Sequence, residues 1–431
     1  MKTGIKYLHS YLIICASFII RIIYVLNTTV GQRQHDLGYA TLLDDGIINP
    51  GHLGYVEYIA KFRHLPDFDP FSIFSYYHPP LHHVIAAVVV DIAHGLGVSE
   101  PAVYEFIQLP TCIYGCLTVY VAFLILKCLT DDEKNLIIPL ALVAFHPGLI
   151  YMSGTVNNDM LAALLSFLCI YTTIRWVQTD HSLKYLIFMA LSIGIGLISK
   201  LNVAVLIFPM GAVMLFRFVR TLKTGETGRC IREYLLFAVI SIPTGLSWSI
   251  RNLVRFSVKP GISSATPESN QYLGGYPLSE VIGLPVQSSI SFPFHSENAV
   301  YCHNAWSILF KTSLFGETFP EDISSGMLLF CQAAFVIAIL TAFICAILAI
   351  VRPIIYIRQG DRELGIFLLV GYTTLLATYI LFVIKYPYTC SCDFRYVPTA
   401  LVYASAALLP VRHRTHTNTQ PSSAPQQAQA N

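Results

Sequence analysis

Six ionisable side chains stand at the ends of long apolar segments, and their types suit a site for a polar, phosphorylated molecule. They are Asp36, His78, Asp159, Lys200, Arg251 and Arg395. Carboxylates at helix ends can face a polar substrate. Lysine and arginine can pair with phosphate, and arginine is the better suited because its planar fork binds two oxygens at once. If the fold brings these residues together, they predict one polar cavity.

Both carboxylates also have simpler explanations. Asp36, in "QHDLGYA", can be a solvated loop residue paired with Arg33. Asp159, in "NNDML", begins an apolar run, where an acidic side chain caps free N–H groups and meets the positive end of the helix dipole. Position alone does not separate a structural role from a chemical one for either residue.

The roles of the histidine and of the three cations are also left open by the sequence. His78 precedes two prolines in "YYHPPLHH", which stiffen the chain and fix the direction of the ring, but a lone histidine is more often structural. The neighbouring His82 and His83 do not predict a metal site, because adjacent residues on a helix point about 100° apart. The cations can be interfacial anchors, since long basic side chains reach from helix ends to water.

The composition is that of a polytopic membrane protein. Of 431 residues, 55% are hydrophobic and only 12% are charged, and apolar runs repeatedly approach the ~20 residues that a membrane-spanning helix needs. The net charge of +2 says little about partners, and no nucleic-acid partner is expected. Ten runs able to cross lie near residues 5–30, 107–129, 136–153, 157–176, 184–199, 201–216, 233–250, 326–351, 364–384 and 396–411.

A further apolar run, residues 81–97, decides the topology. It is short and carries Asp91, whose charge at mid-bilayer costs about 3 kcal/mol. Lys and Arg prefer cytoplasmic loops, and the basic clusters at 217–232 and 352–362 fall there only if 81–97 does not span. We therefore expect one all-α domain over 1–411 with about 10–11 transmembrane helices. Ten are favoured, with both termini in the cytoplasm and 81–97 as a juxtamembrane or re-entrant helix.

This topology gives two large outer loops, 31–106 and 251–325, and places the six ionisable residues at the outer ends of their helices. In the first loop, "YVEYIAKF" predicts an amphipathic helix that lies flat on the outer leaflet, with Glu57 and Lys61 paired at i,i+4. The polar segment 412–431 predicts a disordered cytoplasmic tail, because it has too little apolar surface to bury.

Most of the eleven cysteines lie inside apolar runs, where they act as small hydrophobic residues. Cys302, Cys390 and Cys392 instead fall on the outer, oxidising side. Cys302 can form a disulfide with one of the other two, or all three can remain thiols.

Seven short motifs, by their order and spacing, resemble those of the GT-C superfamily of polytopic glycosyltransferases. The likeness is to the protein O-mannosyltransferase-like and aminoarabinose-transferase-like branch. The motifs are Asp36 in "QHDLGYA", "LP" at 65–66, "YYHPPL", "FHPGLIYMSGTVNNDML" with Asp159, "GLISKLN", "WSIRN" and "FRYVP". The resemblance covers roughly residues 5–260, and a weaker similarity continues to the last helix. One departure is that many relatives have an acidic residue after the first-loop aspartate, whereas here Leu37 follows it and His35 precedes it.

The resemblance implies a GT-C-like bundle in the cell membrane that transfers a sugar from a polyprenyl-phosphate donor to an acceptor hydroxyl. Transfer occurs on the non-cytoplasmic face with inversion at the anomeric carbon. A hydroxyl is a poor nucleophile near neutral pH, so a carboxylate must take its proton during attack. Asp36 is the candidate base. Arg251, with Arg395 or Lys200, would stabilise the charge on the departing phosphate.

The two remaining residues have supporting roles in substrate binding. His78 would orient or protonate the phosphate, and Asp159 would hold sugar hydroxyls or position a cation. No cofactor beyond the donor itself and no metal ion are expected. The partners are membrane lipids, the lipid-linked donor, and an acceptor that is a protein, a lipid or a glycan.

A transporter or flippase of lipid-linked sugars is the alternative function. Such a protein is expected to have charges at mid-helix and broken helices in two matched halves. In this sequence most charges lie at helix ends, and one large early loop replaces the matched halves. A non-catalytic accessory subunit also fits the pattern, but a glycosyltransferase is favoured.

Overall fold

The computed structural model describes residues 6–37, 49–259, 269–283, 288–317, 320 and 322–411, and the predicted tail 412–431 lies outside these. Within the described residues every regular element is a helix, which confirms the all-α prediction. The α-helices are α1 (Leu8–Leu26), α2 (Gly51–Phe62), α3 (Leu81–Gly95), α4 (Gln108–Leu129), α5 (Glu133–Ala144), α6 (Pro147–Tyr151), α7 (Asp159–Gln178), α8 (Leu183–Leu197), α9 (Ile207–Thr224), α10 (Thr227–Phe256), α11 (Leu278–Val281), α12 (Ser288–Ser291), α13 (Ala305–Phe315), α14 (Ser325–Arg358), α15 (Arg362–Lys385) and α16 (Ala400–Leu408). Short 3-10 helices are η1 (Arg33–His35), η2 (Ala102–Ile107), η3 (Met152–Gly154), η4 (Leu201–Leu206), η5 (Thr389–Cys392) and η6 (Phe394–Tyr396).

Fewer of these helices can cross a membrane than the ten expected. In the described chain seven are long and apolar enough, or up to eight if the bent pair formed by α5 with α6 and η3 is one span. The predicted runs at 184–199 and 396–411 do form helices, but α8 has 15 residues and α16 only 9. A straight helix needs about 20 residues to cross the hydrocarbon core. The helix α3 is also short, with 15 residues, and its membrane position stays a prediction.

One predicted span is broken rather than continuous. The run 136–153 bends by 57° between α5 and α6, at Pro147, the first residue of α6. Proline lacks an N–H group and disfavours helical geometry in the residue before it, so the helix ends at Ala144 and a new one starts at Pro147. This break turns the chain toward the beginning of α7.

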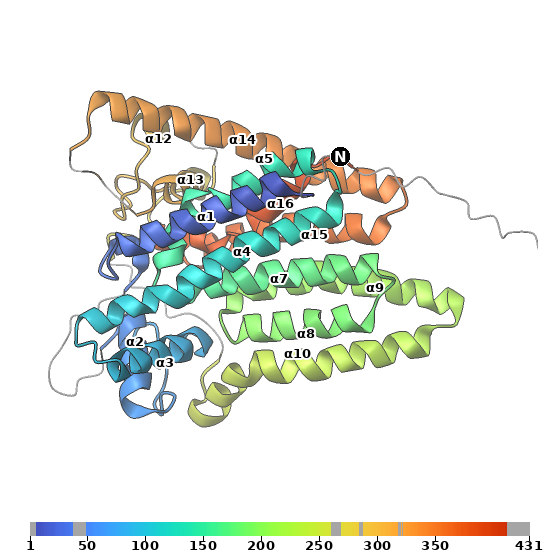
Figure 1. The fold of residues 1–431 in the computed structure, drawn as a ribbon, viewed down its shortest axis with the longest axis horizontal. Coiled ribbons are helices and arrows are strands. Elements are labelled where there is room, and N and C mark those ends of the chain that lie inside the picture. The colour runs from blue at the N-terminus through green and yellow to red at the C-terminus, as the bar shows by residue number, and fades with distance from the viewer. Residues whose placement is uncertain are drawn as a thin grey trace, which may run out of the picture.

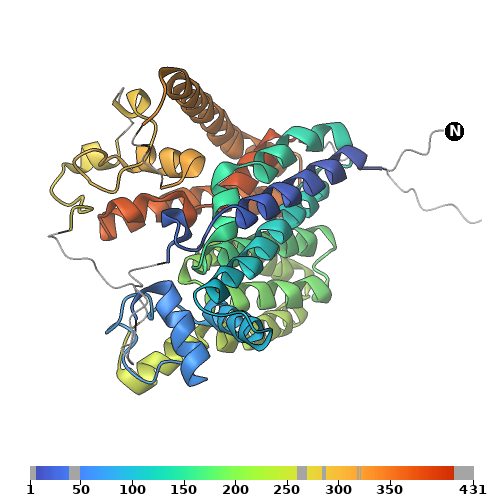
Figure 2. The ribbon, with the colours of Figure 1, turned by 60° about the vertical axis from the view of Figure 1, so that its left-hand side comes forward.

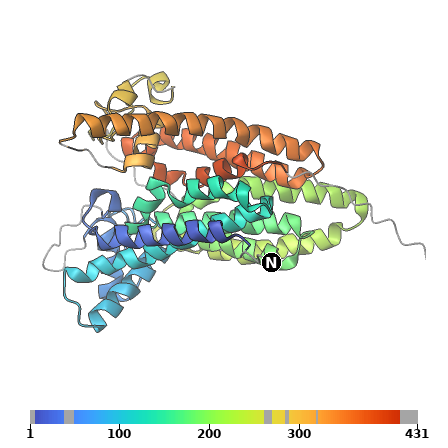
Figure 3. The same cartoon turned by 45° about the horizontal axis from the view of Figure 1, so that its top comes forward.

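The long helices run side by side, and the elements of both large loops gather at one end of the bundle (Figure 1). The helices α2 and α3 from the first loop, and α12 and α13 from the second, lie at that end in both side views (Figures 2 and 3). The helix α1 begins at the opposite end. The prediction that 31–106 and 251–325 are outer loops stays a prediction.

Helix α2 does not present its apolar face to the surrounding lipid. Tyr55, Val56 and Tyr58 are almost completely buried, in a cluster that includes Ala86 and Val90 of α3. The face is covered by α3, and the expectation that this helix lies flat on the outer leaflet stays a prediction. Glu57 does not pair with Lys61 among the described residues: it accepts a hydrogen bond from Asn49 at 2.9 Å.

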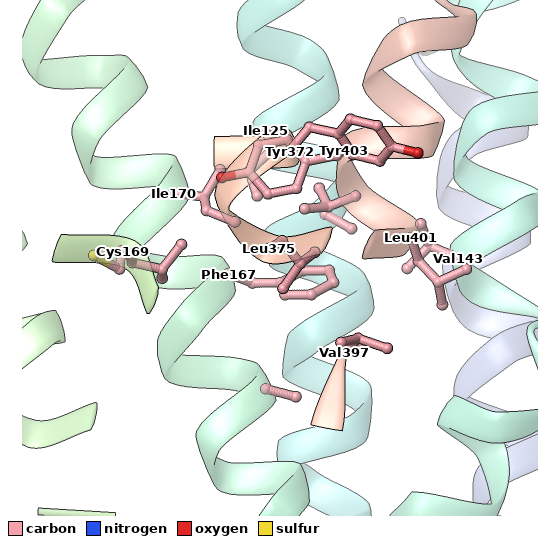
Figure 4. Close-up of a cluster of buried hydrophobic side chains, with 14 of the residues drawn as sticks. Ile125, Val143, Phe167, Cys169, Ile170, Tyr372, Leu375, Val397, Leu401 and Tyr403 are labelled. Atoms are coloured by element: carbon pink, nitrogen blue, oxygen red, sulfur yellow. The ribbon is translucent and has the colours of Figure 1, made fainter. Parts of the chain in front are cut away.

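The main core joins the two halves of the chain. Ile125 of α4 and Phe167 of α7 lie in one buried cluster with Tyr372 and Leu375 of α15 and Leu401 of α16 (Figure 4). This packing holds the beginning of α7 close to the segment between α15 and α16. All eleven cysteines, which are all among the described residues, are free thiols, so Cys302 forms no disulfide.

Candidate active site

A polar cavity of about 670 Å³ lies where the two large loops meet the beginning of α7. Five of the six residues predicted from the sequence line it: Asp36, His78, Asp159, Lys200 and Arg395. His52 of α2 and Glu317, just after α13, complete its walls. The fold thus brings together groups as far apart in the chain as Asp36 and Arg395, which are separated by 359 positions.

Asp36 is the most closely held carboxylate of this cavity. Its Oδ2 accepts hydrogen bonds from Nη1 of Arg395 at 2.6 Å and from Nδ2 of Asn157 at 2.9 Å, and Nε2 of His52 lies 3.7 Å away. Burial alone would raise the pKa of Asp36, but Arg395, His52 and the Asn157 amide hold the pKa well below its ordinary value. Arg33 pairs instead with Glu297 and lies 3.8 Å from Glu317. Asp36 is therefore an ionised carboxylate directed into the cavity.

The tripeptide Asn157–Asp159 organises the neighbouring wall through three separate contacts. Asn157 donates to Asp36, Asn158 donates to the carbonyl of Ser199 at 2.5 Å, and Asp159 pairs with the ammonium of Lys200. The side chains of Asp159 and Lys200 are only 1% and 8% exposed. Lys200 therefore points into the protein instead of snorkelling to the interface. Asp159 acts as its counter-charge, beyond any effect on the helix dipole.

Replacing Asp159 with asparagine is expected to destabilise the protein strongly. The substitution leaves the Lys200 ammonium buried without a counter-charge, and breaking such a pair from one side costs about 3–5 kcal/mol. Thermal unfolding of the purified protein in detergent should show a lower midpoint. In the double variant Asp159→Asn/Lys200→Met the buried charge is absent, so most of the loss should be recovered. Equal midpoints for the single variant and the parent would contradict the buried ion pair.

Arg251 does not reach this cavity. Its guanidinium donates to the carbonyl of Pro66 and, at 2.9 Å, to Oδ1 of Asn252, and it lies 4.9 Å from the ring centre of Trp248. These contacts tie the last turns of α10 to the first loop, which is the anchoring role left open by the sequence. His78 does line the cavity, where burial lowers its pKa well below the ordinary value and keeps the ring neutral.

Two further carboxylates escaped the sequence analysis. Glu317 and Asp393 line the cavity next to Arg395 and are hydrogen-bonded to each other. Burial raises the pKa of Glu317 to about 8, and the charges of Asp393 and Asp36 add to this, although Arg395, at 4.0 Å, opposes it. Glu317 therefore holds a proton at neutral pH. The only signal in the sequence is the position of Asp393 two residues before Arg395 in "CDFRYVP".

The raised pKa of Glu317 predicts a pH-dependent stability. Because its pKa in the folded protein is above the ordinary 4.5, the folded state binds more protons, and this stabilisation is lost as pH rises through about 8. From pH 5 to pH 8 the free energy of unfolding of the parent should decrease by at most about 1.4 kcal/mol per pH unit because of this group. Glu317→Gln, which cannot ionise, should show a flatter dependence of its unfolding midpoint. Identical profiles for both proteins would contradict a proton on Glu317.

His35, which precedes Asp36, has a structural role. Its ring is fully buried and contacts the carbonyl of Thr29 at 2.7 Å and the hydroxyl of Tyr24 at 2.8 Å. Its own carbonyl accepts the N–H of Val156 at 2.8 Å. A Cβ on Gly154 would lie 2.6 Å from the ring, so glycine is needed there. His35 thus fixes the turn that carries Asp36 against the segment leading to Asn157.

An apolar cavity of about 360 Å³ adjoins the polar one. Its walls include Phe208 of α9 and Leu375 of α15. The residues that line both cavities are Tyr77, His78, Lys200, Phe382, Tyr386 and Tyr396. At this boundary the Lys200 ammonium lies 5.0 Å from the ring centre of Tyr396. Within the described residues no group of three His, Cys, Asp or Glu side chains is placed to hold a metal ion.

Residues 77–248 match the family model described as Dolichyl-phosphate-mannose-protein mannosyltransferase. Over this segment, which is less than half of the chain, the resemblance to glycosyltransferases inferred from the motifs is confirmed. The match includes His78, Asp159 and Lys200, whereas Asp36 and Arg395 lie outside it. This segment is therefore similar to a glycosyltransferase family.

Two solved structures are among those to which this chain is similar. ArnT from Cupriavidus metallidurans bound to undecaprenyl phosphate is 13% identical with a TM-score of 0.41, and the match covers 93% of this chain and 76% of ArnT. The oligosaccharyltransferase of Archaeoglobus fulgidus in the apo form is 14% identical with a TM-score of 0.46, and the match covers 94% of this chain and 51% of that protein. No curated protein matched the sequence.

Proposed function

We propose that this protein is a glycosyltransferase that moves a sugar from a polyprenyl-phosphate donor to an acceptor hydroxyl. The observation that carries the proposal is the junction of two cavities of opposite character. One is lined mainly by apolar and aromatic side chains, the other holds cations and carboxylates, and Lys200 lies at their boundary. A donor with a prenyl chain and a phosphate head fits this junction, with the chain in the apolar cavity and the phosphate beside the cation.

Two cations are available to the phosphate at this place. Lys200 lines both cavities, and Arg395, whose side chain is 16% exposed, lines the polar one. As the sugar leaves, negative charge grows on the phosphate oxygen. Cations that are already fixed in a site with little water stabilise that charge without reorganising. Arg395 is fixed by Asp36, and Lys200 by Asp159.

Asp36 is the base in this proposal. The contacts with Arg395, Asn157 and His52 all involve its Oδ2, so Oδ1 is the oxygen that faces an incoming hydroxyl. Asp36 takes the hydroxyl proton while the acceptor oxygen forms a bond to the anomeric carbon. The bond from that carbon to the phosphate oxygen breaks, and prenyl phosphate leaves with the electron pair. One displacement of this kind inverts the configuration at the anomeric carbon.

The distribution of basic residues supports a site on the non-cytoplasmic face. Asp159 begins α7, whereas Arg175 lies in its last turn, about 24 Å away at 1.5 Å per residue. Arg175 lines a cavity at that other end together with Lys127, Arg220 and Arg362. Cytoplasmic loops carry the excess of Lys and Arg, and Asp and Glu contribute little to this rule. We therefore assign this end to the cytoplasm and the candidate site to the opposite face.

The proposal is tested by supplying the purified protein, in lipid nanodiscs, with a panel of polyprenyl-phosphate sugars that begins with mannose. Acceptors are a Ser/Thr peptide, a lipid and a glycan, and products are detected by mass spectrometry. We expect transfer from at least one lipid-linked donor, with the opposite anomeric configuration in the product. Transfer from a nucleotide sugar alone, or lipid movement across the bilayer without transfer, would contradict the proposal.

A further inference from the structure

His52 is held between two other histidines in the wall of the polar cavity. Its ring lies nearly parallel to His83, at 7°, with the ring centres 5.2 Å apart and only 2.9 Å between Nδ1 of His52 and Nε2 of His83. On another side the ring of His78 stacks at 5.0 Å. His83 in turn stacks on Tyr55 at 4.4 Å. His52 and His83 are 4% and 0% exposed, so packing fixes both rings.

The two rings share one hydrogen between them. Burial lowers the pKa of His83 well below its ordinary value, while the carbonyl of Pro79 raises it, and Nδ1 of this ring has no hydrogen-bond partner among the described residues. We assign the hydrogen of His83 to Nδ1, which leaves its Nε2 as an acceptor, so that His52 donates through Nδ1. The other nitrogen of His52, Nε2, is then without a hydrogen and lies 3.7 Å from Oδ2 of Asp36. Two acceptors thus face each other, with a place for one proton between them.

We propose that His52 and His83 form a relay that receives the proton which Asp36 takes from the acceptor hydroxyl. The inference rests on the proposed function, because that reaction supplies the proton. The hydroxyl proton passes to Asp36 and on to Nε2 of His52, and the hydrogen on Nδ1 of His52 can move to Nε2 of His83. The positive charge is then shared by two rings. When the products leave, the proton returns by the same route to water in the cavity.

The relay answers a difficulty in the chemistry of Asp36. Arg395 and Asn157 favour its ionised form so strongly that it is a weak base and does not hold a proton well. Burial lowers the pKa of His52 to about 4, and the charge of Asp36 raises it. The Asp36 carboxylate therefore favours a proton on the ring of His52 beside it. The charged groups that face His52 are Asp36 and Asp159, which favour its protonation, and Lys200 and Arg395, which oppose it.

A distance of 3.7 Å is too long for a hydrogen bond, but it suits a site that closes on its substrate. Hydrogen bonds of catalytic groups are often long without substrate and shorten when it binds. His52 acts through Asp36 and is a positioning and proton-holding residue.

The test compares His52→Gln and His83→Phe with the parent in the transfer assay. Phenylalanine keeps the packing of the ring on Tyr55 but has no nitrogen. We expect kcat to fall about 10–100-fold in His52→Gln and about 5–10-fold in His83→Phe, with KM for the donor within about twofold. In the parent kcat should fall as pH drops through about 4, and in His52→Gln this fall should move to lower pH. The exposed His64, changed to Gln, is the matched control for the same loop.

A purely structural role would lower kcat equally at every pH. If kcat of His52→Gln falls at the same low pH as kcat of the parent, the relay is overturned. A second measurement does not depend on turnover. Nitrogen NMR of histidine-labelled protein should show that both ring nitrogens of His52 change shift in His83→Phe, and that the pKa of His52 falls in Asp36→Asn, since the carboxylate charge is lost. If the parent transfers no sugar, the proposed function fails. Unchanged His52 signals in both variants would overturn the relay independently.

Discussion

Asp36→Asn is expected to lower the rate of sugar transfer by about two to four orders of magnitude, the range that a positioned general base contributes. Asparagine has the same shape and can still accept hydrogen bonds from Arg395 and Asn157, but it cannot take a proton. The loss should therefore appear in kcat, with little change in KM for the donor. Initial rates at saturating donor and acceptor measure it. Binding of the donor to the variant, followed by fluorescence of a labelled prenyl chain, should be preserved.

The control for this substitution is Asp180→Asn, at the end of α7 opposite the candidate site. The side chain of Asp180 is fully exposed, and its φ of 49° is one that asparagine also adopts. This variant should transfer sugar at the parental rate. Because Asp36→Asn also removes the charge that faces Arg395, its unfolding midpoint must be measured alongside. A folded Asp36→Asn variant with undiminished kcat would exclude Asp36 as the base.

The carboxylates and cations could be predicted from the sequence because charged residues are only 12% of this chain and stand out where they adjoin apolar runs. Five of the six residues found in this way do line one cavity. The sequence pattern does not show on which side of its helix a charged side chain lies. Arg251 and Arg395 occupy equivalent places in the sequence, but Arg251 lies on a helix of 30 residues whose last turns pack against the first loop at Pro66. Only the packing of α10 distinguishes them.

The neutral partners of the site could not be predicted in the same way. Asn157 carries no charge, so nothing in the composition marks it, although it stands two residues before Asp159. His52 belongs to a helix whose apolar face was assigned to the lipid, and its role depends on His83 of α3, a helix that the hydropathy pattern left uncertain. Glu317 acquires its proton through burial beside Asp393, which is a consequence of the tertiary fold.

The broken span between α5 and α6 shows a different limit of prediction from the sequence. "AFHPG" contains the proline that ends a helix, so the break between α5 and α6 follows from local rules. Its consequence is not local. The bend turns η3 toward His35, and the N–H of Val156 then reaches the carbonyl of His35. In this way a proline that does not itself line the cavity helps to place Asn157 beside Asp36, a contact that spans 121 positions of the chain.

Arg395→Gln is expected to lower kcat by about two to three orders of magnitude, the effect of removing one preorganised donor from a developing anion. Two consequences oppose each other. The leaving phosphate loses its guanidinium, while Asp36 loses the cation that lowers its pKa and so becomes a stronger base. The gain in basicity returns only part of the loss, because a rate follows basicity fractionally. The fall of kcat at low pH should also move to higher pH, because the charge of Arg395 lowers the pKa of both His52 and Asp36.

Arg395→Lys separates charge from shape. Lysine keeps the positive charge but not the planar fork, so a loss of about tenfold is expected, between the parent and Arg395→Gln. Arg229→Gln is the matched control, because its side chain is 63% exposed in the first turn of α10, at the other end of the bundle. If Arg395→Gln kept the parental kcat and raised only KM for the acceptor, Arg395 would bind the acceptor instead. In that case Lys200 would be left as the cation that stabilises the phosphate.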